Sequence, residues 1–187
     1  MTLLVIGLAA FFAAHSFTMM RGARERLVAR LGALPYRGLH SAISLAGFVA
    51  IVVGYGDAPR IDLWVPPGWL RPVAMVLMLP VFVLLVSAYL PGNIKARVGN
   101  PMLIALKTWA FAHLLVNGDV ASLLLFGSFL AWAVVDLIAV KRSGRSAVVK
   151  EPRAVYDAIA IAIGLIVYGL IVARLHVYLA GVPLTAG

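Results

Sequence analysis

The chain has 187 residues, of which 63% are hydrophobic and 12% are charged. A soluble domain of this length needs more charge to cover its surface, so the composition favours a membrane protein. The sequence has no cysteine, which excludes disulfides, thiolate metal sites and cysteine nucleophiles. The net charge of +9 lies mainly in loops between apolar runs. The positive-inside rule explains that arrangement, and we expect no nucleic acid partner.

The apolar runs predict an all-α bundle of about six transmembrane helices, forming a single domain over residues 1–187. The first run, over residues 1–20, is uncharged and lacks a basic leader, which favours a retained helix over a signal peptide. A basic and helical segment should follow from Arg21. Pro80 should kink the third span. The later spans are predicted at about residues 39–55, 70–90, 100–116, a run ending near 140, and 154–180.

The lysines and arginines predict the orientation of the chain. The loops between spans one and two, three and four, and five and six hold 12 of the 16 basic residues. These loops should therefore face the cytoplasm, and both termini should lie on the other side. We expect a multi-pass protein of a bacterial cytoplasmic (inner) membrane, with the lipid bilayer as its first partner.

Two histidines inside the predicted spans are the main candidates for a site, because ionisable groups at membrane depth are costly. His15 lies in span one, and His113 lies in span four with Trp109 and Asn117 at helical spacing on one face. Each histidine alone could be a packing residue bonded to a neighbouring carbonyl. As a pair on different spans, they have the chemistry of two axial haem ligands. Non-haem copper or iron usually needs three or more ligands, and no such cluster is evident.

Other polar residues have simpler interpretations. His40, with Ser41 and Ser44 close by, is favoured as an interfacial histidine, with a role near haem propionates as the alternative. Lys107 can snorkel to the interface, pair with Asp136, or meet a propionate. The remaining three have ordinary structural roles: Arg174 and His176 as snorkelling or capping groups, and Asp119 as a turn residue.

Three segments together resemble the NnrU family of bacterial membrane proteins. They are His15-Ser16 before the basic loop, the stretch from Gly38 to Leu45, and the more specific stretch from Asn100 to Gly127. The family is similar to 15-cis-zeta-carotene isomerase, a membrane enzyme that contains haem b. The resemblance implies that His15 and His113 are the metal ligands of a haem b. It also implies a context in denitrification.

One departure from the family concerns Asn100, where relatives usually carry histidine before the proline. Asparagine can form hydrogen bonds but cannot ligate iron comparably, so we expect Asn100 to shape the mouth of the cavity or to cap span four. The depths of the two ligands also differ. His15 lies about 9 Å from the cytoplasmic end of its helix, and His113 about 18 Å beyond Pro101. Tilted helices, or a haem with a single histidine, would reconcile these depths.

The predicted function is a haem b membrane protein with redox or gas-related chemistry, or with isomerisation of an apolar polyene. Its catalytic residues, its oligomeric state and the identity of any apolar substrate or redox partner are not predicted. One alternative is a membrane methyltransferase of the isoprenylcysteine type, although Asn100 replaces the histidine of that motif. The other is a non-catalytic assembly factor for a nitrite or nitric oxide reductase.

Overall fold

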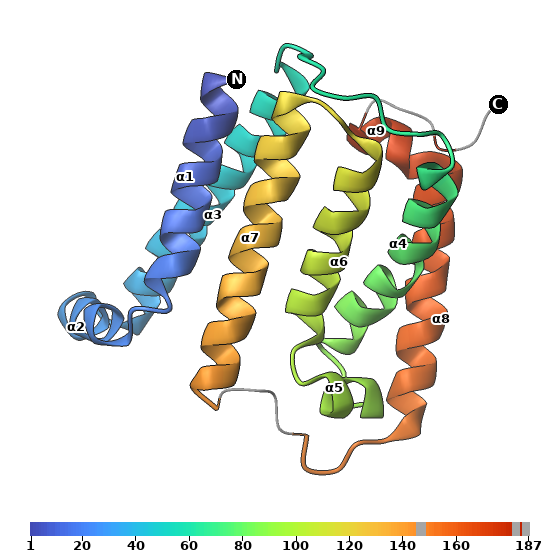
Figure 1. The fold of residues 1–187 in the computed structure, drawn as a ribbon. Coiled ribbons are helices and arrows are strands. Elements are labelled where there is room, and N and C mark those ends of the chain that lie inside the picture. Colours follow the sequence, from blue (N-terminus) through green and yellow to red (C-terminus); the bar gives the residue numbers. More distant parts are fainter. Residues whose placement is uncertain (145–148, 181–183, 185–187) are drawn as a thin grey trace. The chain divides into compact units, whose positions relative to one another are not determined.

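A computed structural model describes residues 1–144, 149–180 and 184. Within them the chain is helical, without a β-strand, as the sequence predicted (Figure 1). The elements are α1 (Thr2–Phe17), α2 (Arg21–Leu31), α3 (Ala33–Gly56), α4 (Leu70–Ser87), α5 (Asn93–Val98), α6 (Pro101–Val116), α7 (Val120–Arg142), α8 (Ala154–Leu170), the π-helical turn η1 (Ile171–Leu175) and α9 (His176–Ala180).

Four helical stretches of the described chain are long and apolar enough to cross a membrane: Ala33–Gly56, Leu70–Ser87, Val120–Arg142 and Ala154–Tyr178. A fifth results if α1 and α2, which meet at 89°, are taken as one bent span. The predicted number of about six spans counts α1 and α6 as separate spans. Each has 16 residues, about 24 Å against a hydrocarbon core of about 30 Å. The chain is therefore a multi-pass membrane protein, and its described residues hold four or five spans by length.

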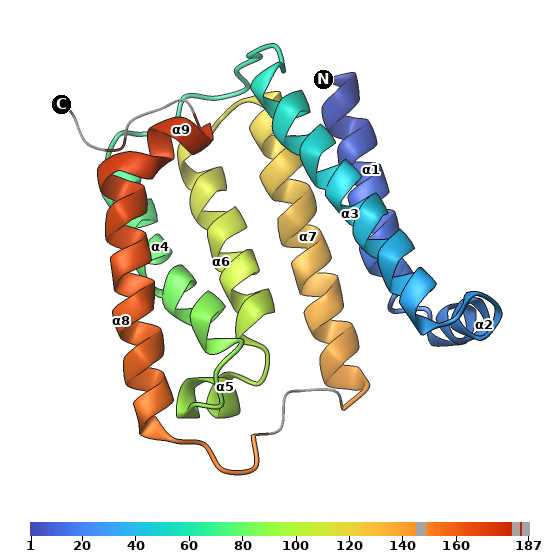
Figure 2. The same ribbon diagram turned by 180° about the vertical axis from the view of Figure 1, so that it is seen from behind.

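Two compact units make up the structure. The first contains residues 1–64 and 118–128, and it is built on a hairpin of α1 and α3, which lie side by side (Figures 1 and 2). Glycines let these two backbones approach closely. A Cβ added to Gly7 would lie 2.6 Å from the nitrogen of Ile51, and one added to Gly54 would overlap the backbone of Leu4. Helices in lipid gain stability from this kind of close packing.

The basic segment after α1 is helical, as predicted, and turns away from α1 as α2. It carries four arginines and one glutamate, and none of its residues is buried. Gly32, with φ +88°, then links α2 to α3. Because α3 starts at Ala33, earlier than the expected residue 39, the helix includes Tyr36, which becomes important below.

The second unit contains residues 65–117 and 129–187, and in it α4 packs against both α6 and α8. Gly164 of α8 lies against Val83 of α4 so closely that a Cβ would come within 2.6 Å of the Val83 nitrogen. Pro80 lies inside α4, as expected, and cannot bond to the carbonyl four residues earlier. Near this break the hydroxyl of Tyr168 donates to the carbonyl of Met75 at 3.0 Å.

Candidate functional site

His15 lies in the last turn of α1, where the helix itself fixes its ring. Its Nδ1 donates to the carbonyl of Phe11 at 2.8 Å. The imidazole stacks on the Phe11 ring, with centroids 4.0 Å apart and planes 23° apart. The carbonyl of His15 is in turn bonded by Thr18, whose hydroxyl donates at 2.6 Å and whose backbone N–H donates at 3.2 Å. The ring is therefore held from the preceding turn, and the backbone from the following one.

His113 has the same arrangement in the last turn of α6. Its Nδ1 donates to the carbonyl of Trp109 at 2.8 Å, and the two rings have centroids 5.2 Å apart. The Trp109 ring also meets Phe129 edge to face at 5.7 Å. Asn117 donates to the carbonyl of His113 through its side-chain amide at 2.8 Å and its backbone N–H at 3.0 Å.

This shared arrangement decides which nitrogen of each ring carries the proton. A carbonyl oxygen can only accept, so Nδ1 carries the proton in both His15 and His113. The lone pair then lies on Nε2, the tautomer that a metal ligand needs. Ligand histidines characteristically donate their other ring N–H to a carbonyl or carboxylate in this way. The chemistry of both residues fits a haem ligand, although the same bond would also satisfy a packing histidine.

The structure places the other predicted site residues as follows. Trp109 lies on the ring of His113, as its spacing predicted. Asn117 lies just beyond the end of α6 and caps the helix. Of the three residues predicted to share one helical face, only Trp109 and His113 therefore lie in the helix. Lys107 is half-buried in α6 and forms no hydrogen bond or ion pair with the residues that the structure describes. His15 belongs to the first unit and His113 to the second, so the pair remains a prediction.

Beside His15, α3 presents a polar surface that the sequence analysis recognised only in part. The ring of His40 lies 5.5 Å from that of His15 and 6.3 Å from that of Tyr36, centroid to centroid. Three buried polar atoms on this face have no hydrogen-bond partner among the described residues: Tyr36 Oη, His40 Nε2 and Ser44 Oγ. The spacing of four residues from Tyr36 to His40 could have indicated that the two side chains share a helical face. The span was predicted to start at residue 39, so Tyr36 was not included in it.

A second polar cluster in the first unit is structural. Asp119 accepts from the backbone N–H of Ser122 at 2.9 Å and from its hydroxyl at 2.6 Å, capping the start of α7. The Ser122 hydroxyl also meets the Tyr55 hydroxyl at 2.8 Å. Burial works to raise the pKa of Asp119, but the Ser122 bonds and the charge of Arg60 outweigh it and hold the pKa below its ordinary value. Asp119 therefore lies between α6 and α7, where a turn was predicted, and acts there as the N-cap of α7.

Asn100 occupies the N-cap position of α6, followed by Pro101 at the first helical position. Its side-chain oxygen accepts from the backbone N–H of Leu103 at 3.4 Å. This combination is common at helix starts, and it confirms the predicted capping role.

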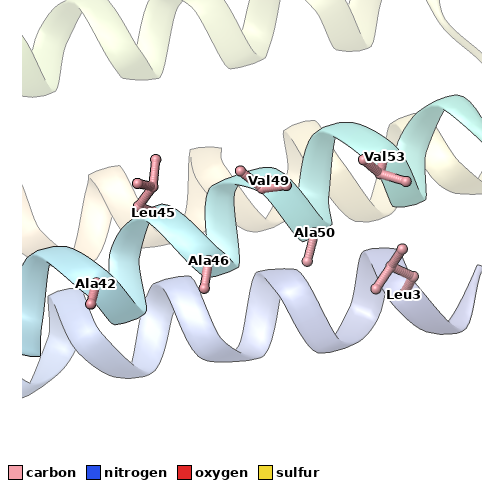
Figure 3. A pocket seen from close by; sticks show the side chains of 7 residues that line it. All are labelled: Leu3, Ala42, Leu45, Ala46, Val49, Ala50 and Val53. Carbon is pink, nitrogen blue, oxygen red and sulfur yellow. The ribbon is translucent and has the colours of Figure 1, made fainter.

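Among the described residues no group of three or more His, Cys, Asp or Glu side chains could hold a metal ion. The groove along α1 and α3, lined by Leu3 and by six α3 residues between Ala42 and Val53, has only apolar side chains in its lining (Figure 3). It offers no group that could bind a polar ligand. The two histidines with a fixed tautomer are therefore the strongest candidates that the geometry provides.

Comparison with known proteins gives one result. A family model described as NnrU protein matches residues 3–184, nearly the whole chain. Neither the curated proteins nor the solved structures gave a match to the chain.

Proposed function

The chain belongs to the NnrU family, and we propose that it is a haem b protein of a bacterial inner membrane in which His15 and His113 are iron ligands. One observation carries this proposal. Both histidines donate Nδ1–H to the carbonyl four residues earlier at 2.8 Å, which leaves the coordinating lone pair on Nε2. The sequence resemblance, which selects the same two residues, supports it independently.

The surroundings of the two rings suit a flat apolar cofactor. Phe11 stacks on His15, and Trp109, which itself packs against Phe129, lies beside His113, so an aromatic ring lies next to each candidate ligand. When bound, haem iron would supply one-electron chemistry if both histidines ligate it, or a position for a gas or a double bond if only one does. The protein contributes two imidazoles of fixed tautomer and an apolar environment that limits the access of water to the iron. The proposed chemistry is redox or gas-related, in a denitrification context, or isomerisation of an apolar polyene.

The test is an optical spectrum of the detergent-purified protein, first oxidised and then reduced with dithionite. A Soret band with sharp reduced α and β bands is expected for two axial histidines on one iron. His15→Ala and His113→Ala should each lower haem content or convert a low-spin spectrum to a high-spin one. A protein that carries two haems, one for each histidine, would instead lose about half of its haem in each variant.

His176→Ala tests a histidine that is not a proposed ligand; His176 lies half-exposed at the start of α9 and is close enough to His113 to interact with it electrostatically. Its spectrum should equal that of the unmodified protein. Unchanged spectra in both His15→Ala and His113→Ala would refute the assignment. A colourless protein, even after expression with added haem precursor, would favour the methyltransferase or assembly-factor alternatives.

A further inference from the structure

The polar face of α3 beside His15 requires a partner that the described residues do not supply. Tyr36 Oη, His40 Nε2 and Ser44 Oγ are buried without a hydrogen-bond partner, and Tyr36 is only 7% exposed. Buried polar groups almost always have partners, and one left alone is costly, more so next to lipid. Three on one helical face therefore indicate a bound group.

The charges around this face indicate what the bound group is. The guanidinium carbon of Arg24 lies 5.8 Å from the centre of the Tyr36 ring. Helix α2 also carries Arg21, Arg26 and Arg30 with a single acidic residue, Glu25, while α3 adds Arg37 and no acidic residue. Helix α1 has no acidic side chain. A phenol and an imidazole that can both donate, in a basic setting, match an anionic acceptor such as a carboxylate.

Spacing restricts the site to two of the three groups. Tyr36 and His40 are one helical turn apart, with ring centroids separated by 6.3 Å. Ser44 lies eight residues from Tyr36, about 12 Å along the helix, so one carboxylate cannot reach all three. Tyr36 is also the member of this face nearest to α2, where a charged group can approach the membrane surface.

We propose that Tyr36 and His40 bind a carboxylate of an amphipathic ligand, with the charge of Arg24 contributing. Resting on the proposed function, the ligand is haem and the carboxylate is one of its propionates, because His40 lies beside the proposed ligand His15. The same chemistry fits a fatty-acid carboxylate. The site would orient an apolar body along α1 and α3 with its acidic end towards α2.

The experiment compares ligands that differ only in the carboxylates. Haem-free protein in detergent is titrated with haemin and with haemin dimethyl ester, and the Soret band reports binding. The unmodified protein should prefer haemin by about tenfold or more, the usual range for hydrogen bonds to a charged group. Tyr36→Phe and His40→Ala should each reduce that preference, with little change in affinity for the ester.

Ser44→Ala is the matched control, since it removes a buried hydroxyl from the same face two turns from Tyr36. It should keep the preference for haemin. If Ser44→Ala removes the preference while Tyr36→Phe and His40→Ala do not, the carboxylate lies elsewhere and the assignment is overturned. Equal binding of haemin and its ester by the unmodified protein overturns the inference and leaves the proposed function intact.

A second arm separates the sources of the carboxylate. If neither porphyrin binds, the proposed function fails, and oleate is compared with methyl oleate by their effect on thermal unfolding. Stabilisation by oleate alone, lost in Tyr36→Phe and His40→Ala and kept in Ser44→Ala, supports a carboxylate site with a lipid ligand. Any other pattern with oleate, once haem binding has failed, overturns the inference.

Discussion

His15 and His113 share a local structure but differ in what surrounds them. In both, Nδ1 bonds to the carbonyl four residues earlier, an aromatic residue at that position supports the ring, and a polar residue caps the histidine carbonyl. Beyond this, the ring of His15 lies near a second histidine, His40, and a set of polar atoms without a partner among the described residues, whereas the ring of His113 lies against that of Trp109. In both cases the histidine's own helix fixes its tautomer, and for His15 the neighbouring helix α3 adds polar groups around the ring.

The largest expected effect comes from disrupting the close packing of α1 against α3, the helix pair that contains His15. Gly54→Ala places a Cβ onto the backbone of Leu4, and backbone cannot move aside as a side chain can. We expect a loss of about 3 kcal/mol in the free energy of unfolding, the upper range for overpacking. The readout is thermal unfolding in one detergent, with the haem spectrum as a second measurement that should report disturbance at His15.

Two further variants make this test specific. Gly164→Ala produces a similar overlap with Val83 in the second unit, so it should destabilise the protein without altering the α1–α3 pair. Gly38→Ala adds a methyl group to the same helix as Gly54, where no atom lies within 4 Å, and it should be neutral or stabilising by up to about 1 kcal/mol. Equal stability of Gly54→Ala and Gly38→Ala would show that α1 and α3 are not closely packed.

The next effect concerns Asp119, which caps α7 in the unit of His15. Asp119→Ala should lower stability by about 1–2 kcal/mol near neutral pH. The folded pKa lies below the ordinary value of 3.8, so the stabilisation is present above that value and is lost as the pH falls through the folded pKa. Unfolding midpoints of the two proteins, measured from pH 7 downwards, should converge below pH 4. A constant difference at every pH would contradict a role for the charged carboxylate.

A smaller effect is expected at Tyr55. Its hydroxyl meets that of Ser122 at 2.8 Å, but Ser122 keeps its bond to Asp119 when the phenol is removed. Tyr55→Phe should therefore cost about 1 kcal/mol, the net worth of one hydrogen bond. Denaturant titration of Tyr55→Phe, Asp119→Ala and the double variant measures the coupling energy between the two residues. Fully additive losses would show that the three groups do not act as one network.

Much of the fold follows from the sequence, because apolar runs indicate the segments that lie in lipid and basic loops indicate the segments that lie in water. Each predicted span contains a helix close to its expected place, and the caps at Asn100 and Asp119 follow from local residue chemistry. The lengths were less predictable: α1 and α6 end where Thr18 and Asn117 cap them, short of a full span.

The site was predictable only where a single helix determines it. Spacing of four residues brought Trp109 and His113 together in the prediction and in the structure. The group of Tyr36, His40 and Ser44 depends on the early start of α3 and on its packing against α1, and neither is encoded in a local pattern. Non-local contacts of this kind require the tertiary structure, which is why the sequence analysis raised a propionate role for His40 only as an alternative and did not include Tyr36.

The smallest expected effect concerns the start of the helix that carries His113. Asn100 accepts one bond from Leu103, and its 3.4 Å length places it among the weaker caps, so Asn100→Ala should cost at most about 1 kcal/mol. Thirteen residues separate it from His113, about 20 Å along a straight helix, so both cannot meet one iron from the same helix. Asn100→His, which restores the residue usual in the family, should likewise leave the haem spectrum unchanged. A shift of the Soret band or of the iron spin state in either variant would place residue 100 at the cofactor. The site beside His113 would then be more polar than its aromatic neighbours indicate, and its contrast with His15 would weaken.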